Sequence, residues 1–437
     1  MIKKIIFTVA LVVFSVGVVL GQNQQLKELL SEGLENNYSL KIVKKEQAQA
    51  ENNASFTNSG MLPTLSVVAD WDFDNEHYDI TYREDNSNLK YTNNDHTLST
   101  GIDLNWTIFD GFKIQTSYKK YKELEDRSKI STRIAVEDFV AVFVAEYFNN
   151  IKENQRLKNL ERAMKLSGER FRIVDARYKI GTFSRLDFLQ ARVDFNVDRA
   201  AFIKQREVVY TSSINLAKLL SADSLSHEIN IIDSVITVNR SLNDTLLLKQ
   251  MFENNSEILY AKKDVAIADL DYKTVIARNY PYLTMYAGYG YAYNKYSRAS
   301  TLKNNYHGYD AGVSFGITIF DPTRRTAKRN AKLSQDMAKL GIQELELELR
   351  AQLKTFWQAY KNNMQLLKLE SVSRTVAKEN YEIANERYML GDLSGIEMRE
   401  AENSLLDAEN RILDAIYNTK ICEISLMQIS GNLNYYL

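Results

Sequence analysis

Two glutamates, Glu397 and Glu400, are the residues whose type and spacing most clearly predict chemistry in this sequence. Because they lie three residues apart in a segment with helical periodicity, both carboxylates are expected on one face of a helix. Neighbouring carboxylates attract cations and repel each other. Their repulsion disfavours the state in which both are ionised, so the charge of the pair is sensitive to pH. The alternative is that both acids only stabilise a helix N-terminus, where the helix dipole favours negative side chains.

No other part of the sequence shows a residue arrangement typical of an enzyme or of a metal site. There is no phosphate-binding glycine loop and no nucleophile motif of the GxSxG type. The four histidines lie in predicted loops or in an insertion and lack the spacing of metal ligands: His77, His96, His227 and His307. The sequence therefore predicts no catalytic residue, no metal and no cofactor.

Both glutamates follow a turn that the chain contains twice. Five residues recur at a constant offset of 210 positions: Arg177, Tyr178, Gly181, Ser184 and Ala191 match Arg387, Tyr388, Gly391, Ser394 and Ala401. In each copy a helix is predicted to end at a left-handed glycine, and a serine to cap the next helix, with an acid three residues later. Each copy is therefore expected to be the tip of a helical hairpin, within a structural unit that the chain uses twice.

Two pairs of predicted strands precede the long helices that lead to these tips. Each strand has one apolar face and one polar or glycine-rich face, in segments of about 11–13 residues with aromatic ends, which is typical of strands that span a membrane. An ordinary sandwich hairpin with one buried face is the alternative. Within these strands the alternation is clearest over 65–73, 98–108, 283–293 and 309–319, and loops are expected at about 75–95 and 295–307.

Four such strands cannot close a barrel by themselves, since the smallest membrane barrels have about eight strands. An open sheet edge in lipid leaves backbone groups unpaired, at a cost of several kcal/mol each. If the strands cross a membrane, several copies of the chain must share one barrel around a water-filled lumen. The long helices would then continue this tube on one side. The segment 344–349 alternates like a strand, but the wider leucine spacing predicts helix there.

The N-terminal residues predict export from the cytoplasm. Lys3 and Lys4 precede an apolar run from Ile5 to Leu20 and a small residue, Gly21, which is the pattern of a signal peptide over 1–21. A membrane anchor is the alternative, although roughly 16 apolar residues are short for a span. The net charge of −1 argues against nucleic acid as the main partner.

The order and spacing of these features resemble the TolC-like outer-membrane efflux protein family. The resemblance covers the mature chain and rests on the twofold repeat, on the paired tips, and on the two strand hairpins that end in Phe109-Asp110-Gly111 and Phe320-Asp321-Pro322. It implies a mixed α and β membrane protein with an internal twofold sequence repeat. It further implies a trimer with a shared 12-stranded β-barrel, continued by a 12-helix periplasmic α-barrel of coiled-coil character with a small equatorial domain.

The domain division expected from the repeat and the resemblance has four parts. They are a signal peptide at 1–21, a first structural repeat at 22–220, an equatorial insertion at 221–243 and a second structural repeat at 244–437. The first repeat has a strand hairpin at about 64–109 and a long helix at about 112–180, and the second has a strand hairpin at about 282–320 and a long helix at about 322–390. The insertion has strand-like segments at 229–232 and 235–238.

The resemblance also implies a function in transport at the cell outer membrane. The chain would be the porin-like channel of a tripartite efflux or type I secretion system, a passive conduit for substrates that an inner-membrane transporter delivers through a periplasmic adaptor protein. The expected partners are two further copies in a homotrimer, the adaptor, the transporter and outer-membrane lipid. The alternative is a non-conducting periplasmic or surface coiled-coil scaffold, which would explain the long helices but not the four strands.

Family members close the periplasmic mouth with acidic rings just beyond the second tip. The matching positions are Glu397 and Glu400, where the family more often has Asp, and Asp187 is the matching acid of the first tip. In a trimer these acids would attract cations and make the gate depend on pH and divalent ions. The expected adaptor contacts are the tip residues Gly181, Thr182, Phe183, Gly391, Asp392 and Leu393. Exposed Phe183 and Leu393 would suit a partner, and a contact that stabilises the hairpin is the alternative.

Five basic residues lie at the start of the second long helix: Arg324, Arg325, Lys328, Arg329 and Lys332. Cations at a helix N-terminus oppose the helix dipole. Two interpretations remain open, which are contact with anionic lipid headgroups and a solvated helix face.

Overall fold

The computed structural model describes residues 24–222, 231, 233, 235–298 and 300–436, so the predicted signal peptide lies outside the described residues. The chain divides into two compact units. Of the described residues, the hairpin unit comprises 24–46, 129–222, 231, 233, 235–260 and 342–436, and the strand unit comprises 47–128, 261–298 and 300–341.

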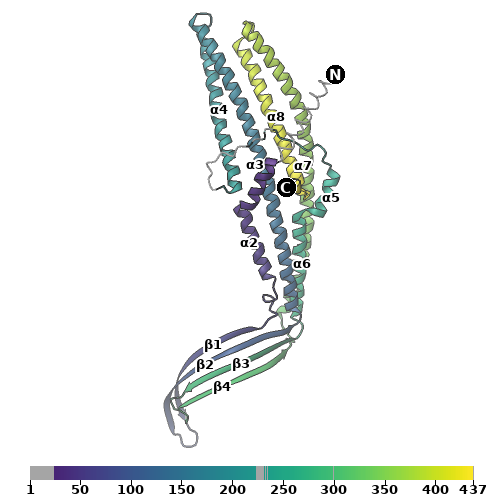
Figure 1. The fold of residues 1–437 in the computed structure, drawn as a ribbon. Coiled ribbons are helices and arrows are strands. Elements are labelled where there is room, and N and C mark those ends of the chain that lie inside the picture. The colour runs from purple at the N-terminus through teal and green to yellow at the C-terminus, as the bar shows by residue number, and fades with distance from the viewer. Residues whose placement is uncertain (1–23, 223–230, 232, 234, 299, 437) are drawn as a thin grey trace, which may run out of the picture. The chain divides into compact units, whose positions relative to one another are not determined.

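The strand unit contains one antiparallel sheet in the order β1-β2-β3-β4 (Figure 1). Because successive side chains of a strand point to opposite faces, the alternating sequence gives the sheet one apolar and one polar face. The register sets Asp103 of β2 beside Gly288 of β3, and Gly288 beside Asp310 of β4. The strands are β1 (Thr64–Thr81), β2 (Asn88–Asp110), β3 (Tyr282–Lys295) and β4 (Lys303–Gly316).

Strands β1 and β2 extend farther than the sequence predicts. The loop expected at about 75–95 is wrong, because the two strands pair without interruption as far as Thr81 and Asn88. The rings of Tyr78 and Tyr91 stack across this pair with their centroids 4.9 Å apart. Both faces of the extension are rich in polar residues, so it lacks the alternation by which a half-buried strand is recognised.

Two related expectations about loops also need correction. The loop predicted at about 295–307 is shorter, because β3 ends at Lys295 and β4 already begins at Lys303. Three of the histidines lie in strands rather than in loops: His77 in β1, His96 in β2 and His307 in β4. His227 lies outside the described residues.

A tight junction joins β2 to helix α3 (Lys113–Lys179). Gly111 has a φ of +70°, and a Cβ atom there would lie 2.3 Å from the carbonyl oxygen of Ala277, so a side chain does not fit. The Asp110 carboxylate accepts a hydrogen bond from the Ile114 backbone N–H at 3.0 Å. This bond satisfies one of the free N–H groups at the helix start.

Helix α7 (Thr323–Leu390) follows the second strand pair in the same way. The Asp321 carboxylate caps it by accepting the Thr323 backbone N–H at 2.9 Å. The segment 344–349 lies inside this helix, as its wider leucine spacing predicts. Further helices are residues 24–36, α2 (Tyr38–Asn53), α4 (Arg185–Leu220), α5 (Asp244–Asn254), α6 (Ser256–Ala277), α8 (Gly395–Ile429) and the short helix η1 (Leu433–Tyr435).

The core of the hairpin unit gathers on the middle of α3. Phe143, Val144 and Tyr147 are fully buried there and pack in one cluster with Leu216 of α4. The Tyr147 hydroxyl donates a hydrogen bond to Asp233 at 2.6 Å, which satisfies its polar end. A second cluster joins α5, α7 and α8 through Met251, Leu353 and Leu426.

The insertion at 221–243 contains no strand among its described residues, so the strand predicted at 235–238 is wrong. Ile236 instead packs against the core cluster on α3. The Asn239 backbone N–H donates to the buried Glu423 carboxylate at 2.8 Å. Contacts with the helices therefore replace strand pairing in this segment. The other strand-like segment, 229–232, lies outside the described residues apart from Ile231.

Candidate functional site

The two helical hairpin tips have the same backbone geometry. Gly181 between α3 and α4 and Gly391 between α7 and α8 have φ values of +82° and +88°. Each glycine and its successor donate backbone hydrogen bonds to the last turn of the preceding helix, as left-handed helix ends do. The bonds run from Gly181 to Tyr178 (3.0 Å), Thr182 to Arg177 (3.0 Å), Gly391 to Tyr388 (3.1 Å) and Asp392 to Arg387 (2.9 Å).

Asp187 and Glu397, two of the three predicted gate acids, cap their own helices. The Glu397 carboxylate accepts the Ser394 backbone N–H at 3.0 Å and the Ser394 hydroxyl at 2.8 Å. The Asp187 carboxylate accepts the same two groups of Ser184 at 3.0 and 2.6 Å. The backbone hydrogen bond from Ser394, together with that of its hydroxyl, lowers the pKa of Glu397 below its ordinary value.

Glu400 lies one helical turn beyond Glu397 and is exposed. It has no ion pair or hydrogen bond with the residues that the structure describes. Gln190, its equivalent in the first tip, donates to Asp194 at 3.0 Å. Of the three predicted gate acids, Glu400 is therefore the one whose carboxylate has no partner among the described residues.

Phe183 and Leu393 are half-buried, so the expectation that both are exposed at the tips is wrong. The Arg177 guanidinium lies over the Phe183 ring, 5.4 Å from its centroid. Leu393 packs against the small apolar cluster that contains Tyr388 and Met398. Both side chains therefore stabilise their own hairpins. The other predicted contact residues, Gly181, Thr182, Gly391 and Asp392, are exposed.

The most exposed apolar side chains at the tips are different ones. They flank the two turns at equivalent positions and are exposed by about three quarters: Ile180 (74%), Leu186 (75%), Leu390 (78%) and Ile396 (75%). The sequence signal for them is an apolar residue directly before each tip glycine and another five residues after it.

An ionic network joins the two hairpins within the hairpin unit. Arg399 of α8 donates to both carboxylate oxygens of Asp198 of α4, at 2.6 and 2.7 Å. Arg170 of α3 donates to Glu402 of α8 at 2.7 Å. A contact of 3.5 Å between Arg399 and Glu402 links the two pairs. The hydrogen bond to Asp198 raises the pKa of the Arg399 guanidinium above its already high value, so this end of the network stays charged.

Sequence reasoning missed this network. Arg399 and Glu402 lie three residues apart beside the predicted gate acids, which is a local signal for a paired face of α8. Their partners Asp198 and Arg170 lie more than 200 positions earlier in the chain, and nothing in the sequence indicates which acid meets which base.

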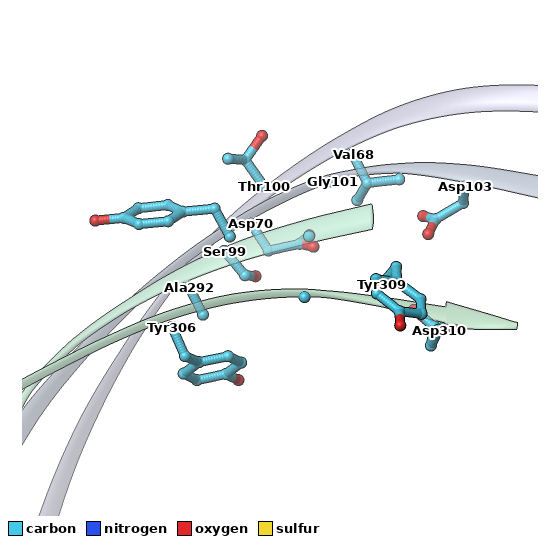
Figure 2. A pocket seen from close by; sticks show the side chains of 13 residues that line it. Val68, Asp70, Ser99, Thr100, Gly101, Asp103, Ala292, Tyr306, Tyr309 and Asp310 are labelled. Carbon is cyan, nitrogen blue, oxygen red and sulfur yellow. The ribbon is translucent and has the colours of Figure 1, made fainter. Parts of the chain in front are cut away.

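The polar face of the sheet carries acidic residues and no basic residue within the four described strands. A Cβ atom at Gly288 would lie 3.1 Å from Oδ1 of Asp103 and 2.9 Å from Oδ1 of Asp310, so the glycine makes room for both carboxylates. Asp70 lines the same shallow hollow (Figure 2). A surface with one sign of charge concentrates counter-ions, here cations. The acids of this face are Asp70, Asp72, Asp74, Glu76, Asp95, Asp103 and Asp310.

Outside the extension of β1 and β2, the opposite face of the sheet is mostly apolar and exposed. The outer edges of β1 and β4 pair with no other strand among the described residues. An exposed apolar surface of this extent, with open strand edges, indicates that lipid or protein covers it. Its exposed residues include Leu65, Val67, Trp71, Phe73, Ile102, Tyr289, Tyr309, Val313 and Phe315.

The comparison with protein families gives a match over most of the chain. The family model described as "Outer membrane efflux protein" matches residues 29–222 and 247–432. The chain belongs to the outer membrane efflux protein family. A curated relative of this efflux protein is outer membrane protein TolC of Vibrio cholerae serotype O1 (strain ATCC 39315 / El Tor Inaba N16961), which is 20% identical over 422 residues that cover 94% of this chain and 91% of that protein.

Solved structures share the mixed, mostly helical fold of the efflux protein. The CmeC outer membrane channel of Campylobacter jejuni has a TM-score of 0.78 at 18% identity, covering 94% of this chain and 86% of that one. The outer membrane protein VceC of Vibrio cholerae has a TM-score of 0.73 at 15% identity, covering 93% of this chain and 96% of that one. The open state of the MtrE outer membrane channel of Neisseria gonorrhoeae has a TM-score of 0.72 at 16% identity, covering 93% of this chain and 89% of that one.

Membership of the outer membrane efflux protein family assigns the chain to transport and locates it in the outer membrane with a periplasmic portion. Proteins of this family are efflux channels and not enzymes. In the described part of the efflux protein no helix is apolar and long enough to cross a membrane. The same part contains no group of three or more His, Cys, Asp or Glu residues that could hold a metal ion.

Proposed function

We propose that this chain is the outer-membrane channel of a tripartite efflux or type I secretion system. It is a passive conduit across the periplasm for substrates that an inner-membrane transporter delivers through a periplasmic adaptor protein. The observation that carries this proposal is the sheet. One of its faces is apolar and exposed, the other is polar with acids as its only charged residues, and the outer edges of β1 and β4 are unpaired among the described residues.

The open edges support a shared barrel. In lipid every unpaired backbone group costs several kcal/mol, so β1 and β4 need partners. In an antiparallel arrangement β4 of one copy, with 14 residues, pairs along β1 of the next, with 18. A trimer would then close a barrel of 12 strands, wide enough for a water-filled lumen. The acids of the polar face would line this lumen and favour cations.

Exposed apolar stripes in the hairpin unit support a helical tube. Side chains spaced seven residues apart lie on one face of a helix and are typical of contacts in coiled coils. In a trimer these stripes would meet the neighbouring copies, and α3, α4, α7 and α8 would form a 12-helix α-barrel with the insertion 221–243 at its equator. The stripes are Leu369, Val376, Ile383 and Leu390 of α7, and Leu186, Leu189 and Val193 of α4.

The tips supply the proposed gate and adaptor contacts. Glu397, Glu400 and Asp187 would form acidic rings at the periplasmic mouth, with Glu400 as the strongest cation site because the other two carboxylates are engaged as helix caps. The adaptor would contact the turns at Gly181, Thr182, Phe183, Gly391, Asp392 and Leu393.

Membrane extraction distinguishes this proposal from a periplasmic or surface coiled-coil scaffold. A channel should stay in the membrane fraction after washing with alkaline carbonate, and detergent should release a trimer that native mass spectrometry detects. A detergent-free monomer in the carbonate wash would contradict the proposal. Drug susceptibility and secreted proteins of a deletion strain would then separate efflux from protein secretion.

A further inference from the structure

Four basic residues form a stripe on the first turns of α7, which we call the basic stripe. Arg325, Lys328, Arg329 and Lys332 have the spacing i, i+3, i+4 and i+7, which places them on one side of the helix. All four side chains are exposed. Lys332 donates a hydrogen bond to Gln335 at 2.7 Å and lies 3.6 Å from Asp336. The other three bases have no ion pair or hydrogen bond with the described residues.

The fold itself gives no reason for these charges. A helix N-terminus favours acids and disfavours bases, and the first turn of α7 contains no acid. The equivalent positions of α3, counted from the aspartate that precedes each helix, are neutral: Ile114, Ser117, Tyr118 and Tyr121. Three of the four bases have no partner among the described residues, and the equivalent positions of the first repeat are neutral. This combination indicates an anionic ligand.

The basic stripe follows directly on apolar surface. Ile319 and Phe320, which lead from β4 to α7, are 92% and 82% exposed. Aromatic rings lie where strands and helices of this unit meet, with Phe109 edge-on to Phe112 at 5.1 Å and Phe112 edge-on to Tyr280 at 6.3 Å. In a membrane protein, apolar side chains lie in the bilayer core, aromatic rings lie at the interface, and bases lie at the headgroups. The residues around the start of α7 follow the same order.

We propose that the basic stripe binds anionic phospholipid headgroups in the leaflet that faces the periplasm. The inference rests on insertion of the sheet into the membrane, which is part of the proposed function. From Arg325 to Lys332 the helix rises about 10 Å, which is comparable with a headgroup layer of roughly 5–8 Å. Arg325 and Arg329 lie one turn apart, and planar guanidinium groups can each hold two phosphate oxygens. Binding would fix the depth of the strand unit in the bilayer.

Lipid retention by the full-length detergent-purified protein tests this inference. The protein is incubated with equal amounts of phosphatidylglycerol and phosphatidylcholine, and native mass spectrometry measures the ratio of the two bound lipids. The stripe variant R325Q/K328Q/R329Q should lower this ratio by about fivefold per charge removed, since each base near an anionic lipid surface contributes about 1 kcal/mol. The control K354Q/K361Q/K368Q removes three exposed bases from a later part of α7 and should keep the wild-type ratio.

An unchanged ratio in the stripe variant, or an equal loss in the control, would overturn the inference. So would a changed reversal potential in bilayers of phosphatidylcholine with an unchanged lipid ratio, because the stripe would then face the lumen. If the triple variant does not assemble, R329Q alone should still lower the ratio about fivefold. Conductance of the wild-type protein in phosphatidylcholine bilayers tests the channel independently of anionic lipid. Failure of lipid binding and failure of the proposed function are therefore distinguishable.

Discussion

Arg399 of α8 and Asp198 of α4 form a two-pronged ion pair, with Nη1 to Oδ2 at 2.6 Å and Nη2 to Oδ1 at 2.7 Å. The side chains are only 17% and 5% exposed. A planar guanidinium that meets both oxygens of a carboxylate has one favoured orientation, so the pair fixes the position of α8 along α4. The two helical hairpins of the chain are thereby held together.

Replacing Asp198 by Asn should lower the free energy of unfolding by about 3–5 kcal/mol, because it leaves the Arg399 charge mostly buried with less compensation. Denaturant unfolding of the detergent-purified protein measures this change. Glu382→Gln is the matched control, since the pair of Glu382 with Lys378 is exposed and 3.6 Å long. The control should change stability by less than about 1 kcal/mol, and equal effects of both substitutions would contradict the structural role of Asp198.

Acidification should loosen the start of α8. The pKa of Glu397 is lowered in the folded chain, so its capping bonds stabilise the helix end above the ordinary glutamate pKa of about 4.3. This stabilisation is lost as the pH falls through the lower value of the folded state. Hydrogen exchange of the Ser394 backbone N–H, corrected for its intrinsic rate, should therefore rise at low pH.

In Glu397→Ala the same N–H should exchange fast at every pH, because the acceptor is gone. The Ser184 backbone N–H, which donates to Asp187, serves as the internal control and should behave alike in both proteins. A pH dependence at Ser394 that survives the substitution would show that Glu397 is not its cause.

The parts of this structure that the sequence predicts are those with local causes. The left-handed Gly391 and the capping box of Ser394 and Glu397 follow from three residue types within seven positions. The sequence does not predict the extension of β1 and β2, because both of its faces are rich in polar residues and the alternation that identifies a half-buried strand is absent. The burial of Phe183 depends on the guanidinium of Arg177 lying over its ring, a choice of rotamer that spacing does not reveal.

Neutralising Glu400 should weaken channel block by trivalent cations more than neutralising Glu397 does. The Glu400 carboxylate is exposed and unpaired among the described residues, whereas that of Glu397 accepts two hydrogen bonds from Ser394. Block by hexamminecobalt(III) in planar bilayers, compared between Glu400→Gln and Glu397→Gln, measures the difference. The double change to alanine should also raise single-channel conductance.

Glu386→Gln, which removes an exposed acid of α7 before the second tip, is the control and should leave the block unchanged. A larger effect of Glu397→Gln than of Glu400→Gln would mean that the cap opens when the cation binds. It would contradict the proposal that Glu400 is the stronger cation site. Unchanged block and conductance in the double variant would remove both glutamates from the gate.

Closure of the acid-lined sheet by further copies of the chain is tested most directly by the reversal potential in planar bilayers under a KCl gradient. Purified trimer should give discrete conductance steps that prefer K⁺ over Cl⁻, and D103N/D310N should reduce this preference, while the control E379Q/E382Q should not. A purified protein that inserts without conductance steps, or a cation preference that D103N/D310N leaves unchanged, would contradict a lumen lined by this face of the sheet.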